Sequence, residues 1–321
     1  MSMPTTVNED TRPNPALEAE PSAAAHPRPA ARRGCLWLLL GGVFMALLPV
    51  FLSGLYILLY LLFPPPALNV LVLGLDARAG EGFVTRTDSV MVMGVQPARL
   101  DVSLLSIPRD LFIETPGYGL QRINTVNVLG EQDQPGSGAR LAAQAVAQSF
   151  HIPVDRYLRV NFDGFIALVD ALGGIDVEVP SLLIDYAYPT DDFGTTTVQF
   201  EPGWQHMDGW QALAYARTRH ADDDYRRAAR QQQLMVALAQ AVVRPGNWPR
   251  LPAAAAAFFQ SVDTDLTPLD LLALAPTLVL DGAVGSIDRL VIDRDLIQRS
   301  PEGYAIPNYA ALDGWLSTNL R

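Results

Sequence analysis

The hydrophobic positions of the chain form one long uninterrupted run followed by a series of short ones. The long run, Leu36–Phe63, contains 28 residues and no charged side chain. A helix needs roughly 20 apolar residues to cross a bilayer, so this run is long enough to span one with some tilt. The alternative is a cleaved signal peptide, whose apolar core is about 7–15 residues long and is followed by small residues. This run is longer and ends in three prolines, so we expect a transmembrane helix over residues 34–63.

The charges that flank this run predict its orientation. Three arginines precede it closely, and the next basic residue after it is Arg78. Because basic residues tend to stay on the cytoplasmic side, the N-terminus should be cytoplasmic and the chain after Phe63 exported. Residues 1–33 are rich in Pro, Ala and charge and lack a hydrophobic period, so we expect a disordered cytoplasmic tail.

Beyond the prolines, short apolar runs alternate with stretches of helical periodicity. Asn69–Gly74, Ser89–Val95 and Asp101–Ile107 have the continuous apolar character of buried strands, and the turn at 96–98 joins the last two as a hairpin. Further strands are expected at Tyr157–Asn161 and Ile175–Val179, and helices at Ser137–Phe150, Phe162–Leu172, Asp208–Ala216 and Arg226–Val243. This order predicts an α/β fold, a three-layer α/β/α sandwich with a mixed central sheet, preceded by one transmembrane helix.

The composition changes at Arg244–Pro252, which reads RPGNWPRLP. We therefore expect an extracytoplasmic catalytic domain over residues 67–245 and a small C-terminal α-rich extension over residues 246–321. Within the first of these, residues 181–206 are expected to be a long, loop-rich excursion. The extension contains no cluster of polar residues that suggests chemistry.

The charge balance excludes some classes of function. The chain has a net charge of −11, and all 23 of its strong bases are arginines. An acidic chain is a poor candidate for binding nucleic acid, which requires a basic face. The single cysteine, Cys35, excludes a disulfide within one chain. The sequence also lacks a GxSxG elbow, a P-loop and a Cys/His zinc spacing, so covalent catalysis by a protein nucleophile is not indicated.

Four polar clusters lie at the ends of the predicted strands and helices, where sites form in open α/β sheets. They are Asp76–Arg78, Thr85–Asp88, Pro108–Asp110 and the arginine- and aspartate-rich segment Arg217–Arg230. Arginine presents a planar, permanently charged group that suits phosphate. On its own, the last segment has the composition of a solvated, salt-bridged surface. Its arginines, however, begin where an apolar helix ends, and Arg227, Arg230 and Gln231 fall within one helical turn.

Two carboxylates in the first two clusters suggest a metal site. Asp76 ends one predicted strand and Asp88 begins its neighbour, so both can meet at one edge of the sheet. Two close carboxylates repel each other, and Mg²⁺ relieves this repulsion by binding one or two carboxylates together with phosphate oxygens and water. A diphosphate would supply those oxygens. The alternative is a plain ion pair between Asp88 and Arg109 without a ligand.

Taken together, these segments resemble the LytR–CpsA–Psr family. The resemblance covers residues 68–243 and rests on five segments in the family's order: NVLVLGLDAR, RTDSVMVMGV, LLSIPRDLFIETPGYG with QRINTVN, VNFDGFIALVDALGGIDVEVP, and MDGWQALAYARTRHADDDYRRAARQQQ. It implies an α/β/α domain outside the membrane behind one N-terminal helix. Relatives often have Gly before the arginine that matches Arg227, whereas this chain has Tyr225-Arg226-Arg227.

The resemblance also implies roles for individual residues. Asp76 and Asp88 would hold Mg²⁺ against a pyrophosphate, and Asp110 would brace Arg109. The residues implied in phosphate binding are Arg78, Arg109, Arg122, Arg217, Arg219 and Gln231. The residues implied in catalysis are Arg109, Arg217, Arg219, Asp224 and Arg227, with Asp224 as the candidate general base.

The function implied is transfer of a glycopolymer from a polyprenyl-pyrophosphate carrier to peptidoglycan, with Mg²⁺ as cofactor. The cell membrane would hold the protein through its single helix. Two alternatives remain open: a lipid-pyrophosphate hydrolase, and a non-catalytic, membrane-tethered protein that binds the carrier lipid. The apolar faces of Ser137–Phe150 and Phe162–Leu172 would line a slot for the polyprenyl tail or simply form core.

Overall fold

The computed structural model describes residues 31–76, 82–190, 194–218, 223–284 and 287–321, and it divides into two units, Met1–Leu55 and Tyr56–Arg321. Helix α1 (Ala31–Leu62) fills the described part of the first unit, and its last two turns belong to the second. Within α1, the 22 residues Gly41–Leu62 are long and apolar enough to cross a membrane, and the described residues contain one such helix. This agrees with the helix predicted over residues 34–63.

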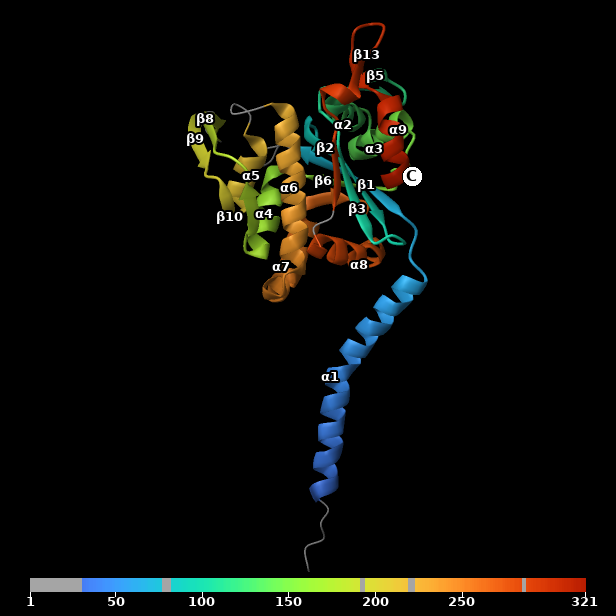
Figure 1. Ribbon diagram of the computed structural model, residues 1–321, viewed down its shortest axis with the longest axis vertical. Coiled ribbons are helices and arrows are strands. Elements are labelled where there is room, and N and C mark those ends of the chain that lie inside the picture. Colours follow the sequence, from blue (N-terminus) through green and yellow to red (C-terminus); the bar gives the residue numbers. More distant parts are fainter. Residues whose placement is uncertain (1–30, 77–81, 191–193, 219–222, 285–286) are drawn as a thin grey trace, which may run out of the picture. The chain divides into compact units, whose positions relative to one another are not determined.

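The second unit is built on a six-stranded mixed sheet with the strand order β11-β6-β1-β2-β3-β12 (Figure 1). The strands are β1 (Leu68–Leu75), β2 (Thr87–Gln96), β3 (Asp101–Ser106), β6 (Arg156–Val160), β11 (Val262–Thr264) and β12 (Asp288–Val291). β2 pairs antiparallel with β1 and with β3, whereas β6 pairs parallel with β1 and β12 parallel with β3. The hairpin that makes the sheet mixed is therefore the one predicted from the turn at 96–98.

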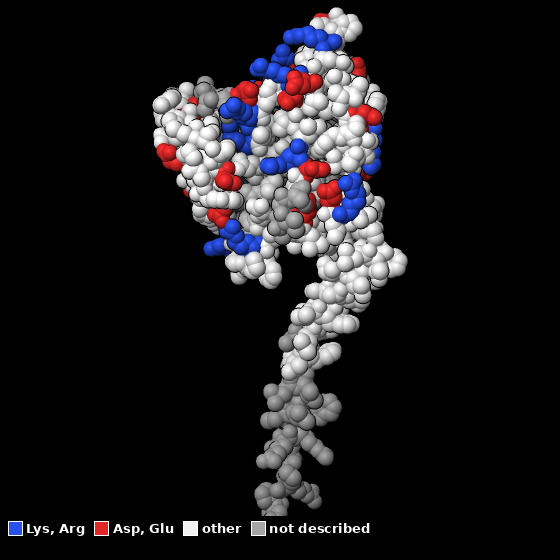
Figure 2. Space-filling model, viewed as in Figure 1, with Lys and Arg blue, Asp and Glu red and all other residues white. Residues whose placement is uncertain are grey.

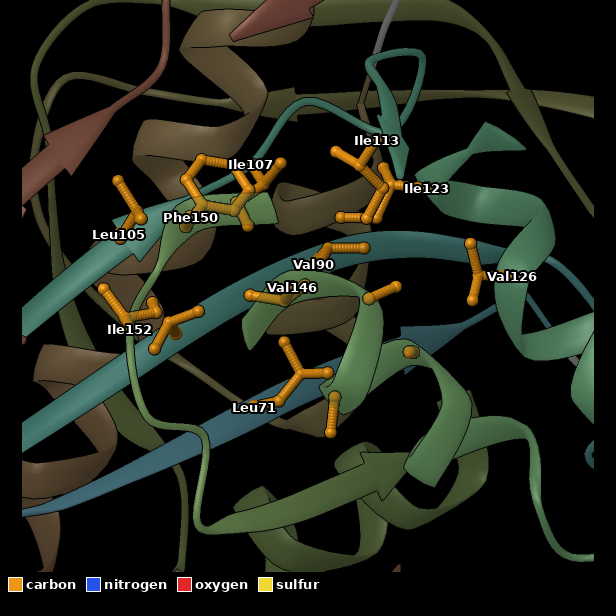
Figure 3. Packing of buried hydrophobic residues seen from close by; sticks show 14 of the residues in the cluster. Leu71, Val90, Leu105, Ile107, Ile113, Ile123, Val126, Val146, Phe150 and Ile152 are labelled. Atoms are coloured by element: carbon orange, nitrogen blue, oxygen red, sulfur yellow. The ribbon is translucent and has the colours of Figure 1, made fainter. Parts of the chain in front are cut away.

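One face of the sheet is covered by α2 (Ile123–Asp133), α3 (Gly138–Phe150) and α9 (Tyr309–Asn319). Leu71, Val90 and Leu105 point from three neighbouring strands toward Val146 and Phe150 of α3 (Figure 3). Side chains alternate between the two faces of a strand, so the intervening residues of β1 serve the opposite core. Continuous apolar strands of this kind need a helical layer on each side.

The opposite face packs against α6 (Asp224–Val243) and α8 (Pro268–Val284), through a cluster that includes Val70, Val72 and Met91. A second hydrophobic cluster lies beyond α6 and combines helices with short strands. Its elements are α4 (Phe162–Leu172), β7 (Ile175–Val179), β8 (Leu183–Pro189), β9 (Thr195–Phe200), β10 (Gly203–Met207), α5 (Gly209–Arg217) and α7 (Leu251–Ser261). The helices on the two faces, with the sheet between them, form the predicted three layers.

Capping residues determine where helices α4 and α5 begin and where α4 ends. Asn161 caps α4 by accepting a hydrogen bond from the Gly164 amide at 2.9 Å. Gly173 ends the same helix with φ of +84°, a left-handed conformation that favours glycine. Asp208 and Gln211 form a capping box at the start of α5. Both helix starts are therefore set by their own sequences.

Two parts of the fold differ from the sequence predictions. Residues 181–206 form β8, β9 and β10, with β8 and β9 paired as a hairpin, instead of a loop-rich excursion. Elements absent from the prediction are α2, β11, β4 (Phe112–Thr115), β5 (Gly119–Arg122), β13 (Ile297–Arg299), β14 (Ala305–Pro307) and the 3-10 helices η1 (Pro245–Arg250) and η2 (Arg294–Leu296). Short strands of three or four residues carry too little periodicity to be recognised.

The predicted boundary at residues 244–252 does not separate two structural units. The segment is mostly η1, and the chain after it supplies both edge strands of the central sheet, β11 and β12. It also supplies α8 and α9, one to each face. Residues 246–321 are therefore part of the domain, because the prolines and glycine of the segment mark a turn within one core.

Candidate functional site

A cavity of about 530 Å³ lies where β1 ends and β2 begins, between the sheet and helices α4, α5 and α6. Its polar lining comes from segments far apart in the sequence: Asp76, Asp88, Ser89, Asn161, Asp185, Arg217, Arg227 and Gln231. Its apolar lining includes Val72, Met91, Phe162, Phe165, Leu213, Leu234 and Met235. The cavity therefore has a charged region and an apolar wall.

Asp76 and Asp88 are brought together by the register of two strands. The last pairs of the β1–β2 ladder are Gly74↔Ser89 and Leu75↔Thr87, so Asp76 directly follows the ladder and Asp88 is the unpaired residue at the irregularity between these two pairs. The Asp76 amide donates to the Arg86 carbonyl at 3.3 Å, and the Thr85 hydroxyl donates to the Asp76 carbonyl at 3.2 Å. The two carboxylates thus face one cavity, as the strand ends predicted.

Arg109 follows β3 and lies within reach of three carboxylates. Its Nη1 donates to Asp88 Oδ1 at 2.8 Å, and its Nε lies 3.8 Å from both Asp110 and Asp224. Burial disfavours the charged guanidinium, but the hydrogen bond to Asp88 and the three nearby carboxylates outweigh it and raise the pKa of Arg109 above its ordinary value. The Asp88–Arg109 ion pair considered from the sequence is therefore formed.

Arg217 lies at the C-terminal end of α5, between two aromatic rings. Its guanidinium carbon is 4.1 Å from the centre of the Phe162 ring and 5.6 Å from that of Tyr188. Its Nη2 is 3.6 Å from Asp76 Oδ1. The two rings and the carboxylate restrict the motion of this long side chain, so the guanidinium group is held at the cavity wall.

The start of α6 presents Asp224, Arg227 and Gln231 along one side, because spacings of three and four residues return to the same helix face. Arg227 Nη1 is 3.0 Å from Asp224 Oδ1, and Arg227 is 5% exposed. Arg226 is exposed and does not line the cavity. Of the adjacent pair, Arg227 is therefore the one that faces the cavity.

Arg230 is buried, and it has a structural role. Its Nε donates to the Tyr215 carbonyl at 3.0 Å and its Nη2 to the Thr218 carbonyl at 2.6 Å. A cation that binds the last carbonyls of a helix stabilises that end. Arg230 thereby fixes the end of α5 from which Arg217 projects.

One of the predicted site arginines, Arg122, stands apart from the cavity. Arg122 is exposed, does not line the cavity and lies 3.8 Å from Asp110, so it reaches the site only through the Asp110–Arg109 contact. Asp110 accordingly lies between two arginines, as a brace would. Arg78 and Arg219 lie outside the described residues.

The sequence analysis missed Asp185 and Tyr188, and it did not predict the contact of Phe162 with Arg217. Asp185 is a buried carboxylate in the cavity wall, and the two rings hold Arg217. Phe162 directly follows a predicted strand end, which is a usable signal. Asp185 and Tyr188 lie in β8, whose residues LIDYAYP do not alternate strictly between apolar and polar, so no clear signal marked that strand.

The two helices considered as a slot for a lipid tail or as plain core lie in different places. Phe162 and Phe165 of α4 line the cavity. The apolar face of α3, including Val146 and Phe150, belongs to the core on the other face of the sheet, which is the second of the two interpretations left open by the sequence. Val72 and Met91 of the sheet and Leu234 and Met235 of α6 take its place.

The carboxylates at the cavity can complete the coordination of a metal ion only together with oxygen atoms from a bound ligand. Among residues that the structure describes, no three or more His, Cys, Asp or Glu side chains are grouped to hold a metal. Two carboxylates at one edge, with phosphate oxygens and water completing six oxygens, match the usual Mg²⁺ environment. The residues present therefore fit a Mg²⁺–diphosphate pair better than a bare ion.

Comparison with known proteins identifies relatives of this chain. The model of the LytR_cpsA_psr family matches residues 65–303, which extends past the resemblance at 68–243 and into the C-terminal region. The polyisoprenyl-teichoic acid–peptidoglycan teichoic acid transferase TagV of Bacillus subtilis is 31% identical over 211 residues, covering 64% of this chain and 51% of the relative. TagU of Oceanobacillus iheyensis, described by the same activity, is 34% identical over 173 residues, covering 53% of this chain and 50% of the relative.

Solved structures agree in fold. The crystal structure of B. subtilis TagV superposes with a TM-score of 0.63 and 27% identity, covering 79% of this chain and 95% of that one. The chain spans about half the length of the two sequence relatives it matches.

Proposed function

Because the chain belongs to the LytR–CpsA–Psr family, we propose that it transfers a glycopolymer from a polyprenyl-pyrophosphate carrier to peptidoglycan. The observation that supports this most is the cavity, where acids and arginines from four distant segments meet beside an apolar wall. A lipid pyrophosphate matches both parts of this lining, because it has an anionic diphosphate and an apolar chain. The transferase activities of TagV and TagU point to the same substrate class.

The geometry of the cavity supports the following arrangement of the lipid-linked substrate. Arg217 and Arg227 line the cavity and would donate hydrogen bonds to the diphosphate. Gln231 adds a side-chain amide one turn further along α6. Arg109 adds a permanent positive charge behind Asp88. The first isoprene units then lie against Phe162, Met91 and their neighbours, where burial of apolar surface contributes about 25 cal/mol per Å².

In the transfer step, a hydroxyl of the acceptor sugar attacks the phosphorus linked to the glycopolymer. A new oxygen–phosphorus bond forms, the pyrophosphate bridge breaks, and polyprenyl phosphate leaves with the electron pair. Arg109, Arg217 and Arg227 stabilise the charge on the phosphate oxygens, and preorganised groups of this kind contribute a few kcal/mol each, roughly. Asp224, held by Arg109 and Arg227, is the candidate acceptor for the hydroxyl proton.

Mg²⁺ is the proposed cofactor, with Asp76 and Asp88 as its protein ligands. When bound, it would neutralise charge on the diphosphate. Asp88 would then bind both the ion and Arg109, so a positive group stands on each side of the carboxylate. Arg122 is proposed to contact the outer part of the glycan donor, since it lies at the edge of the site.

Transfer is tested by incubating the membrane-anchored protein with a lipid-linked glycan and peptidoglycan. We expect polymer covalently attached to peptidoglycan, together with polyprenyl phosphate. Free polymer with none attached would instead indicate the lipid-pyrophosphate hydrolase. Donor binding without turnover of any kind would indicate a carrier-binding protein.

The metal role is tested with Asp88→Asn, which keeps the shape of the side chain but loses its charge. We expect a strongly raised Mg²⁺ requirement for transfer and loss of Mn²⁺ binding measured by electron paramagnetic resonance in the presence of donor. Asp110→Asn is the matched control, because Asp110 also contacts Arg109 but does not line the cavity. Unchanged Mg²⁺ dependence in Asp88→Asn would refute the assignment.

The proposed location is the cell membrane, with Gly41–Leu62 as a single span and the N-terminus cytoplasmic. The site would then lie outside the membrane, where peptidoglycan is found.

A further inference from the structure

Helix α8 is apolar on both its inner and its outer side. Leu274 packs into the core, whereas four large residues point outward: Leu269, Leu272, Val279 and Leu280, which are 75%, 54%, 42% and 41% exposed. At about 100° per residue these four fall within an arc of roughly 100°, so they form one continuous stripe. We call this stripe the outer face of α8.

The charged residues described in α8 do not interrupt this face. Asp270 is bound by Arg156 Nε at 2.9 Å, and Asp281 is buried and accepts a hydrogen bond from the Val102 amide at 2.9 Å. A helix that is apolar all round belongs in a core or in contact with lipid. Its outer face is not in the core, so it needs another apolar partner.

The end of the anchoring helix contacts α8 directly. The Tyr56 hydroxyl donates to the Leu272 carbonyl at 2.5 Å, and the Tyr60 hydroxyl and Thr277 Oγ1 are 2.6 Å apart. Both tyrosines belong to the apolar segment Gly41–Leu62. Tyrosine is enriched where a membrane span meets water. α8 therefore lies beside the last two turns of this segment.

The segment between α1 and β1 keeps the start of the sheet close to the end of α1. Five residues, Phe63–Ala67, separate α1 from β1, and three of them are prolines. Fully extended, five residues reach about 18 Å at most. Helix α7, which lies at the same lower end of this unit as α8 in Figure 1, contains no charged residue between Leu251 and Ser261 and exposes Phe259.

We infer that the outer face of α8, together with α7, lies in the headgroup–acyl boundary of the bilayer that α1 spans. The inference rests on the proposed anchoring by α1. A bilayer fits this face because the face continues from a segment that lipid would already surround. The described part of the face carries no arginine, so burial of apolar surface, not attraction to anionic lipid, drives the contact.

The contact between α8 and the bilayer sets the distance between the membrane and Asp76, which the pyrophosphate of the lipid carrier must reach. β1 starts near the membrane and has eight residues, so Asp76 lies roughly 25 Å along the strand from that end. A pyrophosphate that reaches Asp76 must draw part of its tail out of the bilayer. The cavity residues Val72 and Met91 share one hydrophobic cluster with Leu266 and Leu271 around α8, so apolar side chains continue from the membrane side to the cavity.

The test uses the full chain with Cys35→Ser as background and one new cysteine in each variant. Leu272→Cys reports on α8, Val50→Cys on the span, and Leu182→Cys is the control, since Leu182 is equally half-exposed but precedes β8. Each cysteine carries an environment-sensitive fluorophore. The protein is placed in phosphatidylcholine vesicles with and without brominated lipid, and aqueous iodide is added separately.

We expect brominated lipid to quench the labels at positions 50 and 272, and iodide to quench the label at 182. The quenching at 272 should not change when phosphatidylglycerol replaces part of the phosphatidylcholine. If position 50 is not quenched by lipid, the anchoring proposal fails. If position 50 is quenched but 272 behaves like 182, the inference about α8 alone is wrong.

A label at 272 shielded from both quenchers would show that a second protein copy covers the face, which also overturns the inference. Leu269→Cys repeats the measurement at a second position of the stripe and guards against local distortion by the label.

Discussion

At the scale of single residues, the site depends on how each arginine is restrained. Arg217 is held by two rings and by Asp76, Arg227 by Asp224, and Arg109 by Asp88. Long flexible side chains lose rotamer entropy when they bind, so arginines that are already fixed bind phosphate more tightly than free ones. Arg226, next to Arg227, lacks this enclosure because it points outward.

Arg217→Ala should lower kcat/KM for transfer about 100- to 1000-fold, the usual effect of removing one preorganised donor. Arg226→Ala, the matched control, should change it less than about threefold, because an exposed charge contributes little. Arg217→Lys should remain far below the native chain, since lysine keeps the charge but loses the planar fork. Steady-state transfer assays measure all three, and equal effects of Arg217→Ala and Arg226→Ala would contradict the assignment.

At the scale of secondary-structure elements, a buried polar network holds the carboxylate edge in place. Arg159 of β6 is 1% exposed and donates to Glu131 and Asn127 of α2 and to Asp263 of β11. Asn127 in turn donates to the carbonyls of residues 83 and 85, both at 2.8 Å. The segment that leads into Asp88 is therefore tied to the middle of the fold.

Arg159→Met should destabilise the chain by about 3–5 kcal/mol, because it leaves the buried Glu131 carboxylate without its cation. The double variant Arg159→Met with Glu131→Gln should regain much of that loss. Urea unfolding followed by tryptophan fluorescence measures both. A double variant that is less stable than the single one would show that the ion pair is not the source of the effect.

The same network predicts a pH dependence. Burial by itself would raise the pKa of Glu131, but hydrogen bonds from the Gly136 amide, Arg159 and the Gly138 amide lower it below its ordinary value of about 4.3. A lowered pKa stabilises the folded chain above the unfolded value, and this contribution is lost as pH falls through the folded pKa. The unfolding free energy should thus fall below about pH 4.

Glu131→Gln should show a shallower loss of stability below that pH than the native chain does. Unfolding midpoints measured in urea between pH 3 and pH 7 make the comparison. Parallel curves for the two chains would mean that other carboxylates cause the acid sensitivity.

At the scale of the whole molecule, the C-terminal region completes the domain. β12 pairs with β3 and β11 with β6, so both edges of the sheet come from residues after 260. Leu312 and Leu316 of α9 are buried in the main core. Figure 2 shows arginines and acidic residues intermixed over the viewed face.

A chain that stops at Arg244 should therefore fail to fold. It would expose both sheet edges and lose core contacts on both faces, which is far more than the net stability of about 5–15 kcal/mol typical of domains. Limited proteolysis and circular dichroism melting of the extracted protein test this. Leu316→Ala, with an expected cost of about 2–5 kcal/mol, is the control that should still fold. A cooperative melt from the shortened chain would restore the idea of a separate extension.

The sequence by itself determined the features that depend on neighbouring residues. These are the long apolar helix, the strands that became β1, β2 and β3, the Asn161 and Asp208 caps, and the polar clusters at strand ends. Periodicity and capping act within a few residues, so a linear pattern records them. The family's motifs added which of those clusters belong to one site.

Only the tertiary structure decided which residues surround the cavity and which parts form one domain. It turned Arg227 inward and Arg226 outward, placed Asp185 in the wall, and set β12 beside β3 although about 180 residues separate them. Such contacts arise when distant elements share a core, and no local pattern encodes them. The physical reason is that burial is a property of the packed molecule and not of any one segment.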